Sequence, residues 1–515
     1  MYNEDVNDQY TDHDDGNGNG DSVLTYEEEE EEYQKIRKEH VFSEIDYTKR
    51  KSKIICTLGP SSSEVEDIIK LFDEGMACAR FNFSHGTVKM LEIRGREIRT
   101  TEVDDKAPEY LVASEETKWK EGFLMRPGQQ AFISCDNLFQ KCIPSRIQCT
   151  YRELPKLVKP NDVIYMDDGK IVCLVTDCEH NGIHIEIKGG GILSSRANIK
   201  LPSGKHDNLP ILHPLDEGDL ISFALKNNCD FVAVPYTIRK RDIQQVRDVL
   251  GPNGAHIQIL AKIDTVDSLH NFEEIVKAAD GVIINRVELA LELPAEKLML
   301  AQKWMVDRTV QEGKPVFVQS QILESMILSD QASRSDAEDV SATLLEGVDS
   351  FILTHETSIG KNPVDAVIQL AKCIAEAENI YDYDQVYQDI RQDSINNSKN
   401  LSTVDLLATT ACNIAIESNV EIFVCLTETG RIARYVAKYR PFQSILACST
   451  SSAVVKQVNL SRGVIGYKIP THLILKVAKE QELCMAGNKV LIFYTENEGK
   501  KNETVHFKLV DIEQD

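Results

Sequence analysis

Three ionic residues at the ends of two apolar segments carry the strongest chemical signal in this sequence. Lys262 and Asp264 lie two positions apart in the apolar segment 258–264, so they share one face of a strand. Glu288 follows the next apolar segment, Gly281–Asn285, one strand-helix-strand unit later. An ammonium and two carboxylates at neighbouring strand ends can hold a divalent metal against an anionic substrate. A buried network of ion pairs is the alternative that these residues leave open.

A second group of polar residues ends an earlier apolar segment. Arg80, Asn82 and Ser84 alternate within Ala79–Gly86, so they share one face of a strand. The Arg80 guanidinium offers a bidentate fork to a phosphate or a carboxylate. The sequence therefore places an anion-binding group on a second strand.

Short β-rich segments alternate with helical periods from about residue 50, which is typical of parallel α/β structure. Eight such strands close a barrel. The expected strands are Lys53–Thr57, Cys78–Phe83, Glu109–Ser114, Phe231–Pro235, Ile257–Ile263, Gly281–Asn285, Pro315–Gln319 and Ser350–Leu353.

The residue composition changes twice along the chain. A segment rich in Gly and Pro turns separates the third and fourth expected strands, and a polar linker near Asp384 precedes a further α/β block. We predict a (β/α)8 TIM barrel at 41–117 and 215–384, an inserted β-barrel-like domain after strand three at 118–214, and a C-terminal α/β domain at 385–515.

Composition restricts the class of protein. The net charge is −25, and residues 1–40 hold 14 acids against 3 bases, so we expect an acidic, disordered tail there. The acidic balance argues against binding to nucleic acid or to an anionic membrane. Thirteen scattered cysteines without CxxC spacing, and an N-terminus without a signal sequence, indicate a cytoplasmic protein with reduced thiols.

Several motifs resemble those of pyruvate kinases, in the same order along the chain. They are Lys53–Pro60 (KIICTLGP), Ala79–Gly86 (ARFNFSHG), Leu293–Lys297 (LPAEK), Leu323–Met326 (LESM) and Tyr439–Pro441 (YRP). The resemblance implies transfer of a phosphoryl group from phosphoenolpyruvate to ADP in glycolysis, with Mg²⁺ or Mn²⁺ and K⁺ as cofactors. It also implies a homo-tetramer, or a hetero-oligomer with a related pyruvate kinase.

The resemblance assigns roles to individual residues. Lys262 stabilises the phosphoryl group in flight, and Asp264 and Glu288 bind the divalent metal, although the family has Glu and Asp at these two places respectively. Ser320 stands where a threonine delivers the proton to the enolate. Substrate and nucleotide contacts are expected from Arg80, His85, Arg196 and Ser320.

The third strand has two possible registers. Leu91–Thr100 (LEIRGREIRT) is similar to the family's third-strand motif, but it begins only five residues after Gly86, and a parallel crossover normally takes about a dozen residues. We therefore expect a helix over 88–103 and strand three at Glu109–Ser114. This register gives a K⁺ site made of Asn82, Ser84, Glu116 and Thr117, and it leaves the arginine of that motif without a counterpart.

Two other functions remain open. A paralogue that keeps the fold without turnover, acting as an oligomer partner or scaffold, would explain the exchanged metal acids. A Schiff-base aldolase that uses Lys262 would suit a barrel but leaves Asp264 and Glu288 without a role. The loop Thr427–Ile432 resembles the sugar-bisphosphate loop of regulated pyruvate kinases, but Glu428 there replaces a lysine, so we expect no activation by a sugar phosphate.

Overall fold

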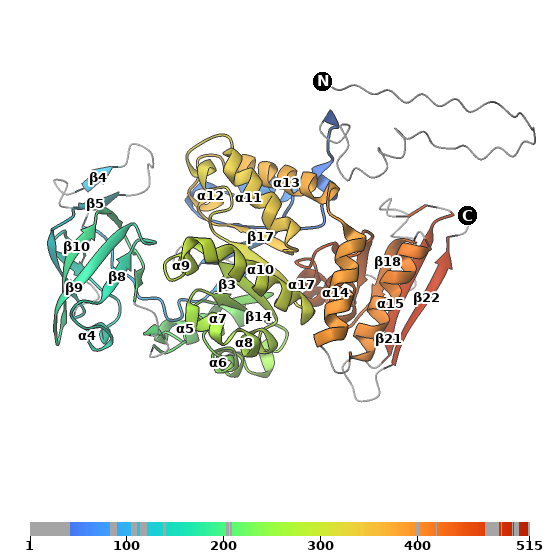
Figure 1. Ribbon diagram of the computed structural model, residues 1–515. Coiled ribbons are helices and arrows are strands. Elements are labelled where there is room, and N and C mark those ends of the chain that lie inside the picture. Colours follow the sequence, from blue (N-terminus) through green and yellow to red (C-terminus); the bar gives the residue numbers. More distant parts are fainter. Residues whose placement is uncertain are drawn as a thin grey trace, which may run out of the picture. The chain divides into compact units, whose positions relative to one another are not determined.

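The computed structural model (Figure 1) describes residues 42–82, 90–104, 111–113, 121–136, 141–201, 205–206, 209–397, 401–418, 420–468, 484–485, 487–496, 498 and 504–512. Contacts divide the chain into the units Met1–Glu44 and Ile45–Asp515. The fold described below belongs to the second unit. The predicted acidic tail lies outside the described residues.

Eight parallel strands close a barrel, as the sequence predicts. Around the barrel the order is β1, β17, β16, β15, β14, β13, β3 and β2. Their bounds are β1 (Lys53–Thr57), β2 (Met76–Asn82), β3 (Met90–Glu92), β13 (Phe231–Val234), β14 (Gln258–Ile263), β15 (Gly281–Asn285), β16 (Val316–Gln319) and β17 (Ser350–Leu353).

Alternation along the strands separates an inner core from an outer one. Met90, Leu260, Ile283 and Phe317 belong to one small buried cluster inside the barrel. Their neighbours in sequence, such as Ile259, pack instead with residues of the surrounding helices. This period of two decides which polar side chains at the strand ends point into the barrel.

Helices connect the strands of the barrel and pack around it. They are α3 (Val65–Asp73), α5 (Pro214–Asp219), which continues as a π-helical segment (Leu220–Leu225), α6 (Lys240–Leu250), α7 (Val266–His270), α8 (Phe272–Ala278), α9 (Arg286–Ala290), α10 (Ala295–Gln311), α11 (Arg334–Leu345), α12 (His355–Ser358) and α13 (Pro363–Asn379). Pro294 is the N-cap of α10 and Pro363 is the first residue of α13, positions where proline's missing N–H removes no intrahelical bond.

Strand three is β3, and the prediction of a helix over 88–103 is wrong. β3 pairs in parallel with β2, Arg80 opposite Met90 and Asn82 opposite Glu92, and with β13 on its other side. The crossover rule fails here because β3 has three residues and starts beside Arg80, near the end of β2. The start of β3 is therefore level with a point only two residue positions, about 7 Å, before the end of β2.

The turn after β3 is fixed by helices on the outside of the barrel. The Asp216 carboxylate at the start of α5 accepts hydrogen bonds from the backbone N–H groups of Arg94 (2.9 Å) and Gly95 (3.0 Å). The Arg96 guanidinium makes a buried bidentate pair with Asp242 in α6, at 2.8 and 2.9 Å. These contacts hold the short strand in register although few residues connect it to β2.

The inserted segment forms two small sheets. One has the order β12, β8, β9, β10, β6, β7 and the other β11, β5, β4. The segment predicted as barrel strand three contains β4, which pairs with β5 instead. The elements are β4 (Leu111–Ala113), β5 (Glu121–Met125), β6 (Gln130–Ser134), β7 (Arg146–Gln148), α4 (Leu154–Leu157), β8 (Val163–Met166), β9 (Ile171–Glu179), β10 (Gly182–Gly189), β11 (Gly191–Ser194) and β12 (Ile199–Lys200).

The C-terminal part is a five-stranded sheet in the order β20, β19, β18, β21, β22, with only β22 antiparallel to its neighbour. Its elements are α14 (Tyr383–Asn397), α15 (Thr403–Glu417), β18 (Val420–Leu426), α16 (Arg431–Lys438), β19 (Ser444–Cys448), α17 (Ser452–Val458), β20 (Val464–Tyr467), β21 (Lys489–Glu496) and β22 (Thr504–Asp511). Among the described helices, none has the length and apolar character to cross a membrane.

Candidate active site

The inward face of the barrel becomes ionic where several strands end. On β14 the inward position after Leu260 is Lys262, and on β3 the position after Met90 is Glu92. On β2, Arg80 follows Cys78, which packs against the inner cluster. The carboxyl ends of barrel strands are where TIM-barrel enzymes place their active sites.

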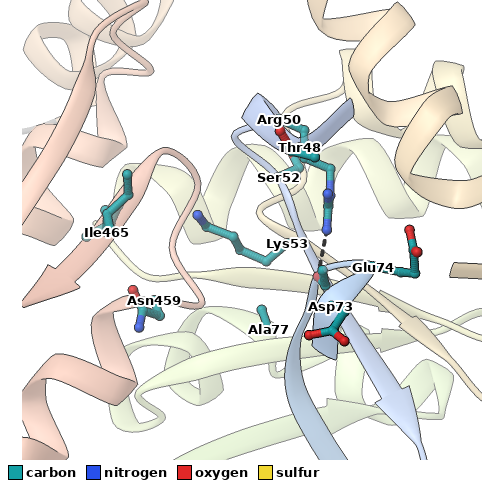
Figure 2. Close-up of a pocket in the computed structure, with 11 residues that line it drawn as sticks. Thr48, Arg50, Ser52, Lys53, Asp73, Glu74, Ala77, Asn459 and Ile465 are labelled. Atoms are coloured by element: carbon teal, nitrogen blue, oxygen red, sulfur yellow. Dashed lines mark hydrogen bonds between the residues drawn. The ribbon is translucent and has the colours of Figure 1, made fainter. Parts of the chain in front are cut away.

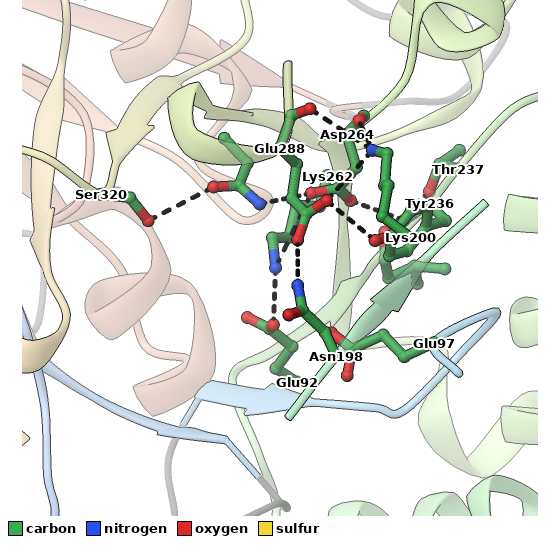
Figure 3. Close-up of polar contacts among 12 residues, drawn as sticks. Glu92, Glu97, Asn198, Lys200, Tyr236, Thr237, Lys262, Asp264, Glu288 and Ser320 are labelled. Carbon is green, nitrogen blue, oxygen red and sulfur yellow. Dashed lines mark hydrogen bonds and ion pairs between the residues drawn. The ribbon is translucent and has the colours of Figure 1, made fainter. Parts of the chain in front are cut away.

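Glu92 joins two cations at this end of the barrel. Its carboxylate accepts from Lys262 Nζ at 2.8 Å, a contact that Figure 3 shows. It also accepts from Arg80 Nε at 2.9 Å, and Arg80 donates to Thr57 Oγ1 at 2.7 Å. All three charged side chains are buried. Burial alone would raise the pKa of Glu92, but the charges of Arg80 and Lys262 outweigh it and lower that pKa to about 2. Burial opposes the charge on Lys262, yet the Glu92 carboxylate raises its pKa.

Asp264 is completely buried and held by neutral donors. One carboxylate oxygen accepts from Asn285 Nδ2 at 2.6 Å, and the other accepts from the Tyr236 backbone N–H at 2.7 Å. Lys262 Nζ lies 3.9 Å from the first oxygen. Burial raises the pKa of Asp264 above its usual value.

Glu288, in the first turn of α9, is held by three residues that are distant in sequence. Its Oε1 accepts from Asn198 Nδ2 at 2.8 Å, and its Oε2 accepts from Tyr236 Oη and Lys200 Nζ, both at 3.0 Å. Burial opposes the charged form, but the Lys200 ammonium outweighs it and lowers the pKa of Glu288. Asn198 and Lys200 come from the end of the inserted domain, so that domain contributes directly to the site (Figure 3).

Ser320 follows β16 and has a left-handed backbone, with φ of 69°, as does Gln321 with 54°. Its hydroxyl donates to Asn285 Oδ1 at 3.3 Å. Arg286 stabilises this unusual turn, because its guanidinium donates to the Ser320 carbonyl at 3.1 Å and to the Gln321 carbonyl. A serine hydroxyl is therefore linked through one amide to Asp264.

A divalent cation does not fit these carboxylates as they are placed. Mg²⁺ requires near-octahedral oxygen ligands at about 2.0–2.1 Å. Each carboxylate oxygen of Asp264 and Glu288 already accepts a hydrogen bond from the protein, and Lys200 brings a positive charge to Glu288. Within the described residues, no group of three or more His, Cys, Asp or Glu side chains is arranged to hold a metal.

Of the remaining predicted residues, only Arg196 has a described side chain, and it does not join this cluster. Arg196 lies in the inserted domain, about half exposed, and pairs with Glu102 at 2.9 Å. His85, Ser84, Glu116 and Thr117 lie outside the described residues, as does the Asn82 side chain. The register that selected Glu116 and Thr117 is wrong, because β3 places Glu92 opposite Asn82.

Several residues at or near this cluster were not predicted from the sequence. Glu92 and Arg99 belong to the segment Leu91–Thr100, which resembles a third-strand motif but follows Gly86 too closely for a normal parallel crossover. With β3 as strand three, Arg99 stands at the place of that motif's arginine, and it pairs with Glu97. Lys200, Asn198 and Tyr236 gave no signal, because nothing in their local sequence indicates contact with a residue 50 to 90 positions away.

A cavity of about 380 Å³ lies elsewhere (Figure 2). It is lined by Arg50, Ser52 and Lys53 at the start of β1, by Ala77 near the start of β2, and by Asn459 and other residues of the C-terminal part. Lys262 and Arg80 stand at the opposite ends of their strands. The cavity is therefore separate from the candidate active site.

Comparison with known proteins agrees with this architecture. A family model described as "Pyruvate kinase, barrel domain" matches residues 49–367, and one described as "Pyruvate kinase, alpha/beta domain" matches 405–508. The pyruvate kinase of Eimeria tenella is 34% identical over 471 residues, covering 87% of this chain and 86% of that protein. The cytosolic isozyme of Glycine max is 33% identical over 421 residues, covering 77% and 79%.

Solved structures give the same result. The pyruvate kinase of Cryptosporidium parvum in complex with ADP is 30% identical, with a TM-score of 0.78, and the match covers 92% of this chain and 98% of that one. A second structure of that enzyme has a TM-score of 0.79, covering 90% and 98%. The motifs, the closed barrel with its insert, and these matches agree, and the chain belongs to the pyruvate kinase family.

Proposed function

We propose that the chain transfers a phosphoryl group from phosphoenolpyruvate to ADP, giving pyruvate and ATP. The observation that carries this proposal is the convergence of Lys262 and Arg80, both buried and inward-facing, at the carboxyl end of the barrel. Two cations in a site shielded from water can stabilise the charge on a transferring phosphoryl group far better than in water. Membership of the pyruvate kinase family supports this choice of substrates.

The residues suggest how the reaction would proceed. The phosphate of the substrate would take the place of Glu92 as partner of Lys262 and Arg80. The bond between phosphorus and the enol oxygen breaks while a β-phosphate oxygen of ADP bonds to phosphorus. The enolate that remains takes a proton at its methylene carbon, for which the Ser320 hydroxyl is the proposed donor.

Other assignments belong to the same proposal. His85 and Arg196 are proposed to contact the substrate or the nucleotide, and Asn82 and Ser84 to contribute to a K⁺ site. With the corrected register, Glu92 takes the place of Glu116 in that site. We further propose glycolysis in the cytosol as the setting and a tetramer, or a hetero-oligomer with a related chain, as the assembly.

A second candidate function is a paralogue that retains the fold but has no turnover. It is favoured by the internal partners of the ionic residues, because Glu92 neutralises the cations and protein donors occupy both predicted metal acids. Such a chain would act as an oligomer partner or scaffold.

A coupled assay separates the two. Pyruvate formation from phosphoenolpyruvate and ADP is measured with and without Mg²⁺, Mn²⁺ and K⁺, using the wild type, Lys262→Met and Lys303→Met as a control at an exposed lysine of α10. The proposal expects turnover in the wild type and the control, and at least about a 10²-fold loss in Lys262→Met. Wild-type turnover equal to that of Lys262→Met would favour the paralogue without activity.

A further inference from the structure

We infer that the Lys200 ammonium is a built-in cation, occupying the space between Asp264 and Glu288 so that no divalent metal binds there. This inference concerns the site of the proposed function but does not depend on turnover. It is tested by metal binding alone, so its failure and the failure of the proposed function are distinguishable.

The surroundings of Lys200 are those of a bound cation. Its side chain is 1% exposed, and Nζ donates to the Asp264 carbonyl at 2.8 Å and to Glu288 Oε2 at 3.0 Å. The Glu288 carbonyl and Glu292 Oε1 lie at 3.4 and 3.3 Å. The ammonium also stands over the Tyr236 ring, 5.0 Å from its centroid. Four oxygens and an aromatic face thus surround one positive charge.

Lys200 and a metal ion exclude each other for two reasons. Both need the same Glu288 oxygen, which a metal would bind at about 2 Å while Lys200 holds it at 3.0 Å. A divalent charge so close to an ammonium would also be strongly repelled in a buried site. Lys200 lies in β12, whose pairing with β8 fixes the backbone from which the ammonium reaches Glu288.

The neighbouring donors complete the exclusion. Asn198, two residues before Lys200, donates to the other oxygen of Glu288, and the hydroxyl of Tyr236 donates to the same oxygen as Lys200. Asp264 is satisfied by Asn285 and by the Tyr236 backbone. Removing only the Lys200 charge leaves Glu288 as a buried carboxylate without its cation, which is the condition under which a metal ion would be taken up.

Mn²⁺ titration followed by electron paramagnetic resonance tests this inference on the full chain. The samples are the wild type, Lys200→Met, which keeps most of the aliphatic stem, and the double variant Lys200→Met/Glu288→Gln. We expect the wild type to leave the signal of free Mn²⁺ unchanged and Lys200→Met to bind one Mn²⁺ per chain at least tenfold more tightly. The double variant should lose that binding.

Two results would overturn the inference. One is Mn²⁺ binding by the wild type that Lys200→Met does not strengthen and Lys200→Met/Glu288→Gln abolishes. The other is a folded Lys200→Met that takes up no Mn²⁺. Circular dichroism shows whether each variant is folded, and Lys200→Gln serves in the same titration if Lys200→Met is not.

Discussion

At the scale of single residues, the barrel mouth holds its charges in fixed pairs. Lys262 and Arg80 share Glu92, and Lys200 faces Glu288. Buried charges are tolerated because each has an opposite partner and further hydrogen bonds. A substrate anion would have to displace the Glu92 carboxylate. This raises the free-energy cost of binding but leaves Lys262 and Arg80 in the site.

His206 gives this region a dependence on pH. Its ring is buried and stacks on Tyr236 with 4.7 Å between centroids. Burial, helped by the charge of Lys200, lowers the pKa of His206 from 6.5 to about 3. The unfolded chain therefore binds more protons between pH 3 and 6.5, and the stability contribution present above pH 6.5 is lost as the pH falls through that window.

We expect lowering the pH from 7.5 to 5 to remove about 2 kcal/mol of the free energy of unfolding through this group. His206→Phe keeps an aromatic ring against Tyr236 and should flatten this acid limb, as measured by urea unfolding at both pH values. The same exchange at the exposed His180 is the control and should change nothing. Equal pH dependence in the wild type and His206→Phe would contradict the assignment.

The residues that the sequence alone could predict are those that follow an apolar segment. Lys262, Asp264 and Arg80 have the inward parity that a period of two reveals, whereas Glu288 lies in the first turn of α9 and Ser320 follows β16. The partners that hold them could not be predicted. The contacts of Asn198 and Lys200 with Glu288 join two domains. A periodic pattern of apolar residues does not indicate a contact between segments so far apart in the sequence.

At the scale of elements, strands with regular crossovers were predictable and the irregular one was not. β1, β15 and β17 have the expected bounds, because each is a clear apolar segment between turn signals. β3 was missed because its three residues carry almost no periodic signal and its connection to β2 is short. Its register depends instead on long-range contacts of the turn that follows.

Gly95 in that turn provides a test of how β3 is held. Its φ is 59°, and a Cβ would stand 2.9 Å from Pro235 Cγ and 3.2 Å from the Pro235 carbonyl oxygen. Gly95→Ala should lower the free energy of unfolding by more than the about 1–2 kcal/mol that a left-handed backbone alone costs. Thermal unfolding measures the loss.

Gly128 is the matched control. Its φ is also positive, at 82°, but a Cβ there would meet nothing within 4 Å. Gly128→Ala should therefore show the conformational cost alone. If the two alanine variants were equally destabilised, the close approach of Pro235 to the turn would not matter for β3.

At the scale of the whole chain from Ile45 onward, one buried carboxylate connects the barrel with the C-terminal part. The Asp349 carboxylate, just before β17, accepts hydrogen bonds from Arg440 Nη1 at 2.7 Å and Nη2 at 3.1 Å. It also accepts one from the backbone N–H of Arg462 at 2.9 Å. Both charged side chains of the pair are 3% exposed. The junction is thus made by a bidentate pair that is shielded from water.

Asp349→Ala should lower the free energy of unfolding by about 3–5 kcal/mol, because it leaves Arg440 buried without its partner. Urea unfolding measures this loss. Glu338→Ala is the control, since its pair with Arg334 is 65% and 89% exposed and such pairs contribute at most about 1 kcal/mol. A loss at Asp349 no larger than that at Glu338 would show that the pair does not hold the two parts together.

We expect the chain to transfer a phosphoryl group from phosphoenolpyruvate to ADP with the help of Lys262 and Arg80, although the Glu92 carboxylate already pairs with both cations. The most direct measurement is ³¹P nuclear magnetic resonance of phosphoenolpyruvate and ADP incubated with the wild type and with Lys262→Met. We predict that the phosphoenolpyruvate signal declines and the γ-phosphate of ATP appears with the wild type only. No ATP with the wild type, or the same amount with Lys262→Met, would contradict the account.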